Sequence, residues 1–317
     1  MARGKKVSIL GAGHVGATIA YTLTLDGMAS EVVLLDTNKD KAKGEVLDII
    51  QGTAFFGPVN IHSGEYEDMA NSDVVVVTLG LARKPGQSRM DLAQANVDLV
   101  KQVIPDAVKH APDAVYVVVS NPVDILTYTL TKISGLPDRQ IVGSGTILDS
   151  ARLRTGLAKH ASLPPRNVHA YVFGEHGDTS VVPWSLATIA GMEMNKYCEH
   201  ICANHGECGK AALKAIEDDV RTAGAKVIGL KGATYYAVSM SVLQICAAIL
   251  RDECSIFTLS ALLHGQYGLE DVALSLPVKL GAGGVEGWIT PPLLPDEAAA
   301  LKRSADALKE VIRALSI

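Results

Sequence analysis

The chain has no long apolar segment and no excess of basic residues. None of its apolar runs reaches the roughly 18 residues that a membrane-spanning helix needs, and the short charged N-terminus leads into a strand-like run instead of a signal-peptide core. The formal net charge is −5, and the lysines and arginines are dispersed along the chain. These absences argue against a membrane protein and against a nucleic-acid-binding surface, and we expect a cytoplasmic protein.

Cysteine is scarce as well, with five residues in 317. An odd number without a secretion signal favours reduced thiols. Cys198, His200, Cys202, His205 and Cys208 offer the usual zinc ligands, but three and five residues separate the successive cysteines, which does not match the common spacing. We therefore predict no metal site. The remaining composition, 48% hydrophobic and 20% charged, is that of a globular chain with one large domain or two modest ones.

A glycine-rich turn follows the first strand-like run. The apolar residues 6–10 lead directly into Gly11-Ala12-Gly13-His14-Val15-Gly16, and a helix-like segment follows at 17–25. In this pattern the first glycine permits a tight turn, the second lets the backbone approach a pyrophosphate, and the third lets the helix pack on the strand. Asp36 ends the next strand, twenty residues after Gly16, where a carboxylate favours NAD over NADP. The alternative is a glycine turn with a loop-capping aspartate.

Strand-like and helix-like segments alternate as far as residue 145. This alternation predicts a doubly wound parallel sheet, which binds ligands at the carboxyl ends of its strands. The alternation then stops, so we divide the chain into residues 1–145 and 146–317, a nucleotide-binding domain and a substrate domain. The expected segments are strands at 32–35, 73–78 and 114–119 with helices at 39–50 and 90–110, then strands at 168–173, 180–189, 256–263 and 272–278 with helical stretches at 209–250 and 296–315.

Three polar segments are candidates for chemistry. The loop 80–89 carries three cations, as expected of a lid that closes on an anion, although a solvated turn has the same composition. Asp149 and Arg152 share one helical face, either as part of a site or as a simple ion pair. His176, in Gly174-Glu175-His176-Gly177-Asp178, follows an apolar run and suits proton exchange, although histidine is also common in ordinary turns.

The motifs occur in a fixed order: GAGHVG, Asp36, ARKPGQSR, SNPVD, LDSARLR, GEHGD and KGATYY. Together they resemble the NAD-dependent L-lactate and L-malate dehydrogenase family over essentially the whole chain. The resemblance implies a Rossmann domain followed by an α+β substrate domain, with NAD as cofactor, a small 2-oxo or 2-hydroxy acid as substrate, and a homotetramer or dimer as the assembly. The family's cofactor-binding positions correspond to Gly11, Gly13, His14, Val15, Gly16, Asp36 and Asn121.

The resemblance also implies catalytic roles. His176 matches the general acid that protonates the ketone oxygen, and Asp149 matches the carboxylate that orients the imidazole. Arg152 matches the residue that grips the substrate C1 carboxylate, for which a planar guanidinium is suited. Arg89 matches the lid arginine that polarises the carbonyl, and Asn121 matches a residue that hydrogen-bonds the substrate beside the cofactor.

The features that bear on the substrate disagree. Arg83 stands where malate dehydrogenases usually have arginine and lactate dehydrogenases glutamine, and a buried cation there is costly without a second carboxylate. Thr234 resembles the lactate branch instead. Arg154 and His169 match the cationic pair that binds fructose 1,6-bisphosphate in allosteric bacterial lactate dehydrogenases, although each could be an ordinary surface residue. The chain thus resembles such a bacterial scaffold with a malate-type arginine, natural or engineered.

We therefore predict an NAD-dependent L-2-hydroxyacid dehydrogenase that interconverts L-malate and oxaloacetate, with residual activity on lactate and pyruvate. An L-lactate dehydrogenase is the main alternative. A non-catalytic dinucleotide-binding sensor on the same fold belongs to a different class, because fold alone does not determine function. The complete set of acid, orienting carboxylate and two arginines favours the enzyme.

Overall fold

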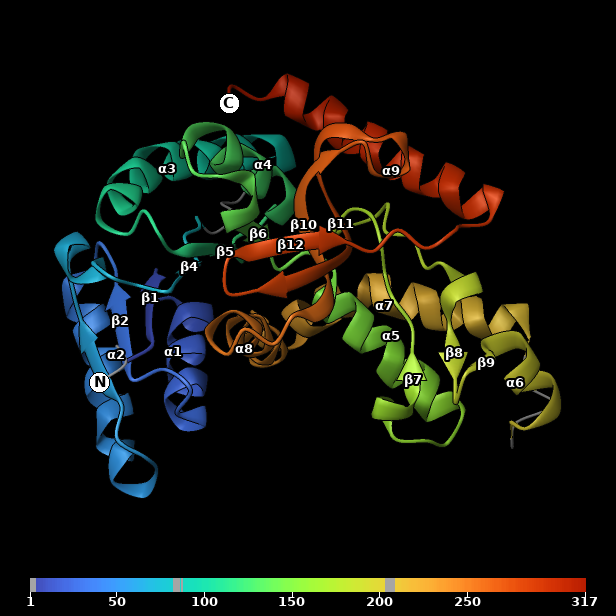
Figure 1. The fold of residues 1–317 in the computed structure, drawn as a ribbon, viewed down its shortest axis with the longest axis horizontal. Helices are drawn as coiled ribbons and strands as arrows, with labels where there is room; N and C mark the ends of the chain where they lie inside the picture. Colours follow the sequence, from blue (N-terminus) through green and yellow to red (C-terminus); the bar gives the residue numbers. More distant parts are fainter. Residues whose placement is uncertain (1–3, 82–85, 87, 203–208) are drawn as a thin grey trace.

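The computed structural model describes residues 4–81, 86, 88–202 and 209–317 (Figure 1). Strands and helices alternate in its first half, as expected. The elements there are β1 (Lys6–Leu10), α1 (His14–Asp26), β2 (Glu31–Leu35), α2 (Lys39–Gln51), β3 (Asn60–Ser63), β4 (Val74–Val77), α3 (Arg89–His110), β5 (Val115–Val118), α4 (Val123–Ile133) and β6 (Ile141–Gly143), with short 3₁₀ turns η1 (Gly52–Phe55), η2 (Tyr66–Met69) and η3 (Asp138–Gln140).

The second half is more irregular. It contains α5 (Ile147–His160), η4 (Pro165–Asn167), β7 (Val168–His169), η5 (Trp184–Leu186), β8 (Thr188–Ile189), β9 (Met192–Glu193), α6 (Met194–His200), α7 (Lys210–Lys231), α8 (Tyr236–Leu250), β10 (Ser255–His264), η6 (Gln266–Gly268), β11 (Glu270–Gly281), β12 (Gly284–Trp288) and α9 (Pro295–Ala314). Among the described residues, no helix is both long and apolar enough to cross a membrane.

One nine-stranded sheet organises the molecule, in the order β12-β11-β10-β6-β5-β4-β1-β2-β3. The strands from β6 to β3 are parallel, and their order reverses beside β1, which confirms the predicted Rossmann sheet. The four valines of β4 are all buried, and alternate ones belong to two different cores. One core lies under α3, α4 and α9, and the other under α1, α2 and α8, so the apolar run is continuous because both faces are covered.

The antiparallel strands β10 and β11 confirm two expected segments, but they extend the same sheet, through a pairing of Ser260 on β10 with Gly143 on β6. The sheet is therefore continuous across residue 145, and the division of the chain there stays a prediction. A third core, beneath α5, α6 and α7, includes Cys198 and Cys202, both buried and free of disulfides. His205 and Cys208 lie outside the described residues.

Three expected elements need correction. The strands predicted at 168–173 and 180–189 are reduced to the short β7 and β8, with an isolated bridge between Phe173 and Val181. Pro183 lacks a backbone N–H and a 3₁₀ turn follows it, so the second run cannot continue a ladder. The helical stretch 209–250 is divided into α7 and α8 at Gly232, whose φ of +85° ends the first helix.

Candidate active site

The glycine turn between β1 and α1 has the geometry of a dinucleotide cradle. Gly11 has a φ of +109°, and a Cβ added to Gly16 would lie 1.9 Å from the Gly11 carbonyl oxygen, so neither position accepts a side chain. Gly13, the N-cap of α1, would meet nothing within 4 Å. Its open side and the N-terminus of α1 together fit a pyrophosphate group.

Asp36, at the end of β2, braces this turn. Its Oδ2 accepts a hydrogen bond from the Ala12 N–H at 2.7 Å, and its Oδ1 accepts one from the Asn38 N–H at 2.8 Å. His14, the first residue of α1, stacks on Tyr235 with ring centroids 5.4 Å apart. The turn is therefore linked both to the second strand and to the segment before α8.

His176 lies in the loop that the Phe173–Val181 bridge closes. Gly174 begins the loop with a φ of +86°, and its N–H bonds to the Ser275 carbonyl oxygen on β11. Two further main-chain bonds hold the loop: the Glu175 N–H donates to Ser304 Oγ at 2.9 Å, and the His176 N–H donates to Asp124 Oδ2 at 2.8 Å. The loop is thus anchored to three elements that are distant in the sequence.

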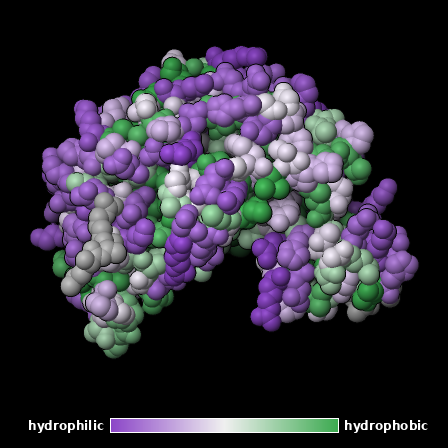
Figure 2. All heavy atoms as spheres, viewed as in Figure 1, coloured by the Kyte–Doolittle hydropathy of each residue, from purple (hydrophilic) through white to green (hydrophobic). Residues whose placement is uncertain are grey.

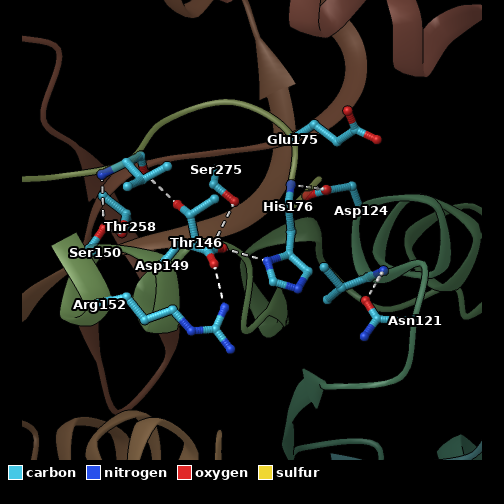
Figure 3. Close-up of polar contacts among 12 residues, drawn as sticks. Asn121, Asp124, Thr146, Asp149, Ser150, Arg152, Glu175, His176, Thr258 and Ser275 are labelled. Atoms are coloured by element: carbon cyan, nitrogen blue, oxygen red, sulfur yellow. Dashed lines mark hydrogen bonds and ion pairs between the residues drawn. The ribbon is translucent and has the colours of Figure 1, made fainter. Parts of the chain in front are cut away.

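The imidazole of His176 points toward the start of α5, where Asp149 lies in the first turn and Arg152 in the second (Figure 3). His176 Nδ1 is 2.5 Å from Asp149 Oδ2, and Arg152 Nη1 donates to Asp149 Oδ1 at 2.8 Å. The ion pair expected as the alternative for Asp149 and Arg152 therefore exists. It coexists with the histidine contact, because each carboxylate oxygen serves one partner.

This arrangement controls the charge of the histidine. Burial by itself lowers the pKa of His176, but the hydrogen bond and negative charge of Asp149 outweigh it, so the pKa is raised above its ordinary value. Burial raises the pKa of Asp149, yet the bonds and charges of His176 and Arg152 reverse this and hold it below its ordinary value. The pair therefore favours a protonated imidazole beside an ionised carboxylate.

A cavity of about 230 Å³ lies beside this pair. It brings together five predicted residues with His176: Val15 from the glycine turn, Asn121 after β5, Asp149 and Arg152 from α5, and Thr234 before α8. Asn121 is the only one of these from the SNPVD segment, and its Oδ1 accepts a hydrogen bond from the Val123 N–H at 3.3 Å (Figure 3). Elements from both halves of the chain thus contribute to one cavity.

Other predicted residues lie outside the cavity lining. Arg89, at the start of α3, is 84% exposed and pairs with Asp178, two residues after His176. Arg154 donates from Nε to the Val168 carbonyl oxygen at 2.9 Å, which brings it next to the exposed His169. Arg83 falls outside the described residues.

Two residues beside His176 had no predicted role. Arg221 on α7 lines the cavity and donates from Nη2 to the Ser180 carbonyl oxygen at 2.8 Å. No sequence signal marks it, since it is one cation on an amphipathic helix. Asp124 had a signal, because it belongs to the SNPVD segment at the end of a buried strand, but its contact with His176 depends on the tertiary fold.

Comparisons with known proteins identify the family of the chain. The family model for the lactate/malate dehydrogenase NAD-binding domain matches residues 5–143, and the model for the lactate/malate dehydrogenase alpha/beta C-terminal domain matches residues 146–316. The chain is 47% identical to L-lactate dehydrogenase 1 of Clostridium acetobutylicum, with 98% of each chain covered. It is 48% identical to L-lactate dehydrogenase of Acetivibrio thermocellus, with 99% of this chain and 98% of that one covered.

A solved structure is also similar over its whole length. The minor L-lactate dehydrogenase of Enterococcus mundtii, in a ligand-bound form, superposes with a TM-score of 0.94 at 38% identity, with 99% of both chains covered.

These findings correct the substrate prediction. The preference for L-malate and oxaloacetate rested on one side chain, Arg83, and is wrong: the relatives that match the whole chain are named L-lactate dehydrogenases. The physical argument for malate assumed that Arg83 is buried in the site, and Arg83 lies outside the described residues. The two family models and the full-length relatives show that the chain belongs to the lactate/malate dehydrogenase family.

Proposed function

We propose that this protein is an NAD-dependent L-lactate dehydrogenase that interconverts pyruvate and L-lactate. The observation that carries the proposal is the contact of His176 with Asp149, beside Arg152 in a cavity that Asn121 and Thr234 also line. The names of the full-length relatives support pyruvate as the substrate. A sensor would need only the dinucleotide cradle and not this proton-donating pair.

The glycine turn fits the cofactor that the family uses. Gly11, Gly13 and Gly16 would hold the pyrophosphate, with His14 and Val15 beside it, and the carboxylate of Asp36 would take a ribose hydroxyl. Asn121 would lie between the cofactor and the substrate. When bound, NADH supplies the hydride that the carbonyl carbon of pyruvate receives.

His176 supplies the proton for the same reduction. Its Nδ1 is engaged by Asp149, so Nε2 is the atom that donates the proton to the carbonyl oxygen, and the C=O bond becomes CH–OH. The raised pKa favours the protonated imidazole that the reduction needs, and the ionised Asp149 stabilises that charged form. In lactate oxidation the neutral imidazole takes the hydroxyl proton back.

The arginines orient and polarise the substrate. Arg152 would bind the pyruvate carboxylate, because its guanidinium can contact Asp149 and the substrate at once. Arg89 would polarise the carbonyl, and its ion pair with Asp178, close to His176 in the chain, supports a position at the mouth of the site. Thr234 would contact the methyl end of pyruvate.

The substrate is tested by comparing kcat/KM for pyruvate and for oxaloacetate with NADH. We expect kcat/KM to be higher for pyruvate by tenfold or more, which is the lower end of the discrimination that a difference in pocket contacts gives between two substrates. An equal or higher value for oxaloacetate would contradict the proposal. The general-acid role predicts a loss of roughly 10²- to 10⁴-fold in His176→Gln.

We further propose fructose 1,6-bisphosphate as an effector bound by Arg154 and His169. The bond from Arg154 to the Val168 carbonyl oxygen holds the arginine against the main chain beside the exposed His169, which supports the proposal. Activation by the bisphosphate should be lost in a double variant Arg154→Gln, His169→Gln. Unchanged activation in that variant would contradict the proposed effector site.

A homotetramer, or a dimer, and a cytoplasmic location complete the proposal. Large apolar side chains exposed on α1, α2 and η1 support association: Tyr21, Leu25, Leu47, Ile50 and Phe55. Figure 2 shows green atoms at the lower left, where η1 lies. Light scattering of the purified protein measures the assembly, and a monomer at micromolar concentration would contradict it.

A further inference from the structure

Asp124 is a buried carboxylate in direct contact with the loop of the proton donor. It lies in the first turn of α4, two residues after the cis Asn121–Pro122 peptide, and it is 3% exposed. Its Oδ2 accepts the His176 N–H at 2.8 Å. Figure 3 shows Asp124 and Asp149 on different sides of His176, so two carboxylates flank the residue that carries the proton.

The charge of Asp124 is poorly neutralised by its surroundings. Within the described part of the chain, its other oxygen, Oδ1, is buried and makes no hydrogen bond of normal geometry, although the Ser260 hydroxyl interacts with the carboxyl and lowers its pKa. The titratable groups that act on it are His176 and Glu175, both in the same loop. A charge at this buried position acts over a longer distance, because the interior screens it less than water does.

We propose that Asp124 is a positioning residue for the general acid: it holds the main chain of His176 and its negative charge favours the protonated imidazole. The inference rests on the proposed role of His176. It assigns a function to the last residue of the SNPVD segment, and it explains why a buried carboxylate without a full set of partners occupies this position at all.

The protonation of Asp124 itself is consistent with this role. Burial raises the pKa of Asp124 to about 6, against the lowering effects of the Ser260 hydroxyl and of the hydrogen bond from the His176 N–H. The carboxyl is therefore ionised above about pH 6 and exerts its effect on the histidine there. The N-terminal end of α4 also favours the ionised form, since the helix dipole is positive there.

The test is the pH profile of Asp124→Asn. The amide can keep the hydrogen bond to the His176 N–H but carries no charge. Loss of the negative charge should lower the pKa of His176. In the pH profile of kcat/KM, the high-pH limb for pyruvate reduction should therefore move to lower pH by roughly half a unit or more, and the low-pH limb for lactate oxidation should move in the same direction. The titration of the His176 imidazole, followed by NMR in the protein without substrate, should shift equally.

Ser304→Ala is the matched control. It removes the neighbouring main-chain bond, from the Glu175 N–H to Ser304 Oγ, without changing any charge. We expect it to lower kcat and leave both pH limbs and the imidazole titration in place. If Asp124→Asn does not fold, Asp124→Ser supplies the same neutral substitution.

The outcomes distinguish the inference about Asp124 from the proposed function of His176. If the imidazole titration and both limbs stay in place in Asp124→Asn, the inference about Asp124 is wrong, whatever happens to kcat. If His176→Gln retains most of the activity, the general-acid role of His176 is wrong, and the limbs of the pH profiles report the titration of another group.

Discussion

Arg221 donates a hydrogen bond from Nη2 to the main-chain carbonyl oxygen of Ser180 at 2.8 Å, and so connects helix α7 to the end of the loop that carries His176. The same guanidinium forms an ion pair with Glu217, one turn earlier on α7. Its Nε is buried without a hydrogen-bond partner among the described residues. The position of the loop that carries His176 is therefore coupled to the packing of a helix that is distant in sequence.

Arg221→Leu should lower both stability and turnover. The variant loses a charge-assisted hydrogen bond and leaves Glu217, which is largely buried, without its cation, so the free energy of unfolding should fall by roughly 1–3 kcal/mol. Denaturant titration measures this. Lys214→Ala, which breaks an exposed pair with Asp218 on the same helix, is the control and should change stability by less than about 0.5 kcal/mol. Similar losses in the two variants would show that the Ser180 contact contributes nothing.

The contact of Arg221 also shows what sequence could not predict here. The buried valines of β4 and the glycine turn are local patterns, and both were predicted because a strand buried on two faces and a tight turn impose their own residue types. Arg221 and Asp124 act through main-chain atoms of a loop from another part of the chain. Such contacts depend on how elements pack, and a main-chain partner leaves no trace in the partner's sequence.

The same reasoning explains the mistaken strands and the mistaken substrate. The run 180–189 has strand-like residues, but Pro183 prevents continuous pairing. The substrate prediction gave one motif position, Arg83, more weight than the full chain, whose relatives are L-lactate dehydrogenases. Local chemistry therefore indicated the reaction, while the choice of substrate needed information from the whole chain.

The stability that His176 confers should depend on pH. Its pKa is raised in the folded chain, so its pairing with Asp149 stabilises the fold fully below the unfolded value of 6.5 and is lost as pH rises through the folded value. His176→Gln should therefore cost more unfolding free energy at about pH 5 than at about pH 9. His264→Gln, which breaks the more exposed pair with Asp138, should cost little at either pH. A cost for His176→Gln that is independent of pH would mean that the imidazole is not charged in the fold.

Glycine substitutions should separate folding from cofactor binding. Gly16→Ala forces a Cβ to within 1.9 Å of the Gly11 carbonyl oxygen, so the turn must move and the thermal midpoint should fall by several degrees, about 4 °C or more. Gly13→Ala meets no protein atom within 4 Å and should fold normally, yet bind NADH about tenfold more weakly because its methyl group occupies the side that the cofactor approaches.

The measurements are differential scanning fluorimetry and a titration of NADH fluorescence. Gly44→Ala, on the exposed side of α2 where a Cβ also meets nothing, is the control and should leave NADH binding unchanged. Normal NADH binding by Gly13→Ala would contradict the assignment of the cradle.

Arg152→Lys should raise KM for pyruvate far more than it lowers kcat. The guanidinium can contact Asp149 and a carboxylate together, whereas an ammonium group cannot reproduce the paired, planar geometry. Because the substrate carboxylate is bound equally in the ground state and the transition state, its weaker binding should raise KM by roughly 10²-fold and leave kcat nearly unchanged. The methyl ester of pyruvate, which has no carboxylate charge, provides the control substrate, and Arg152→Lys should change its kcat/KM by less than about threefold. Equal losses with the two substrates would mean that Arg152 acts through Asp149, as half of the observed ion pair, and does not grip the substrate.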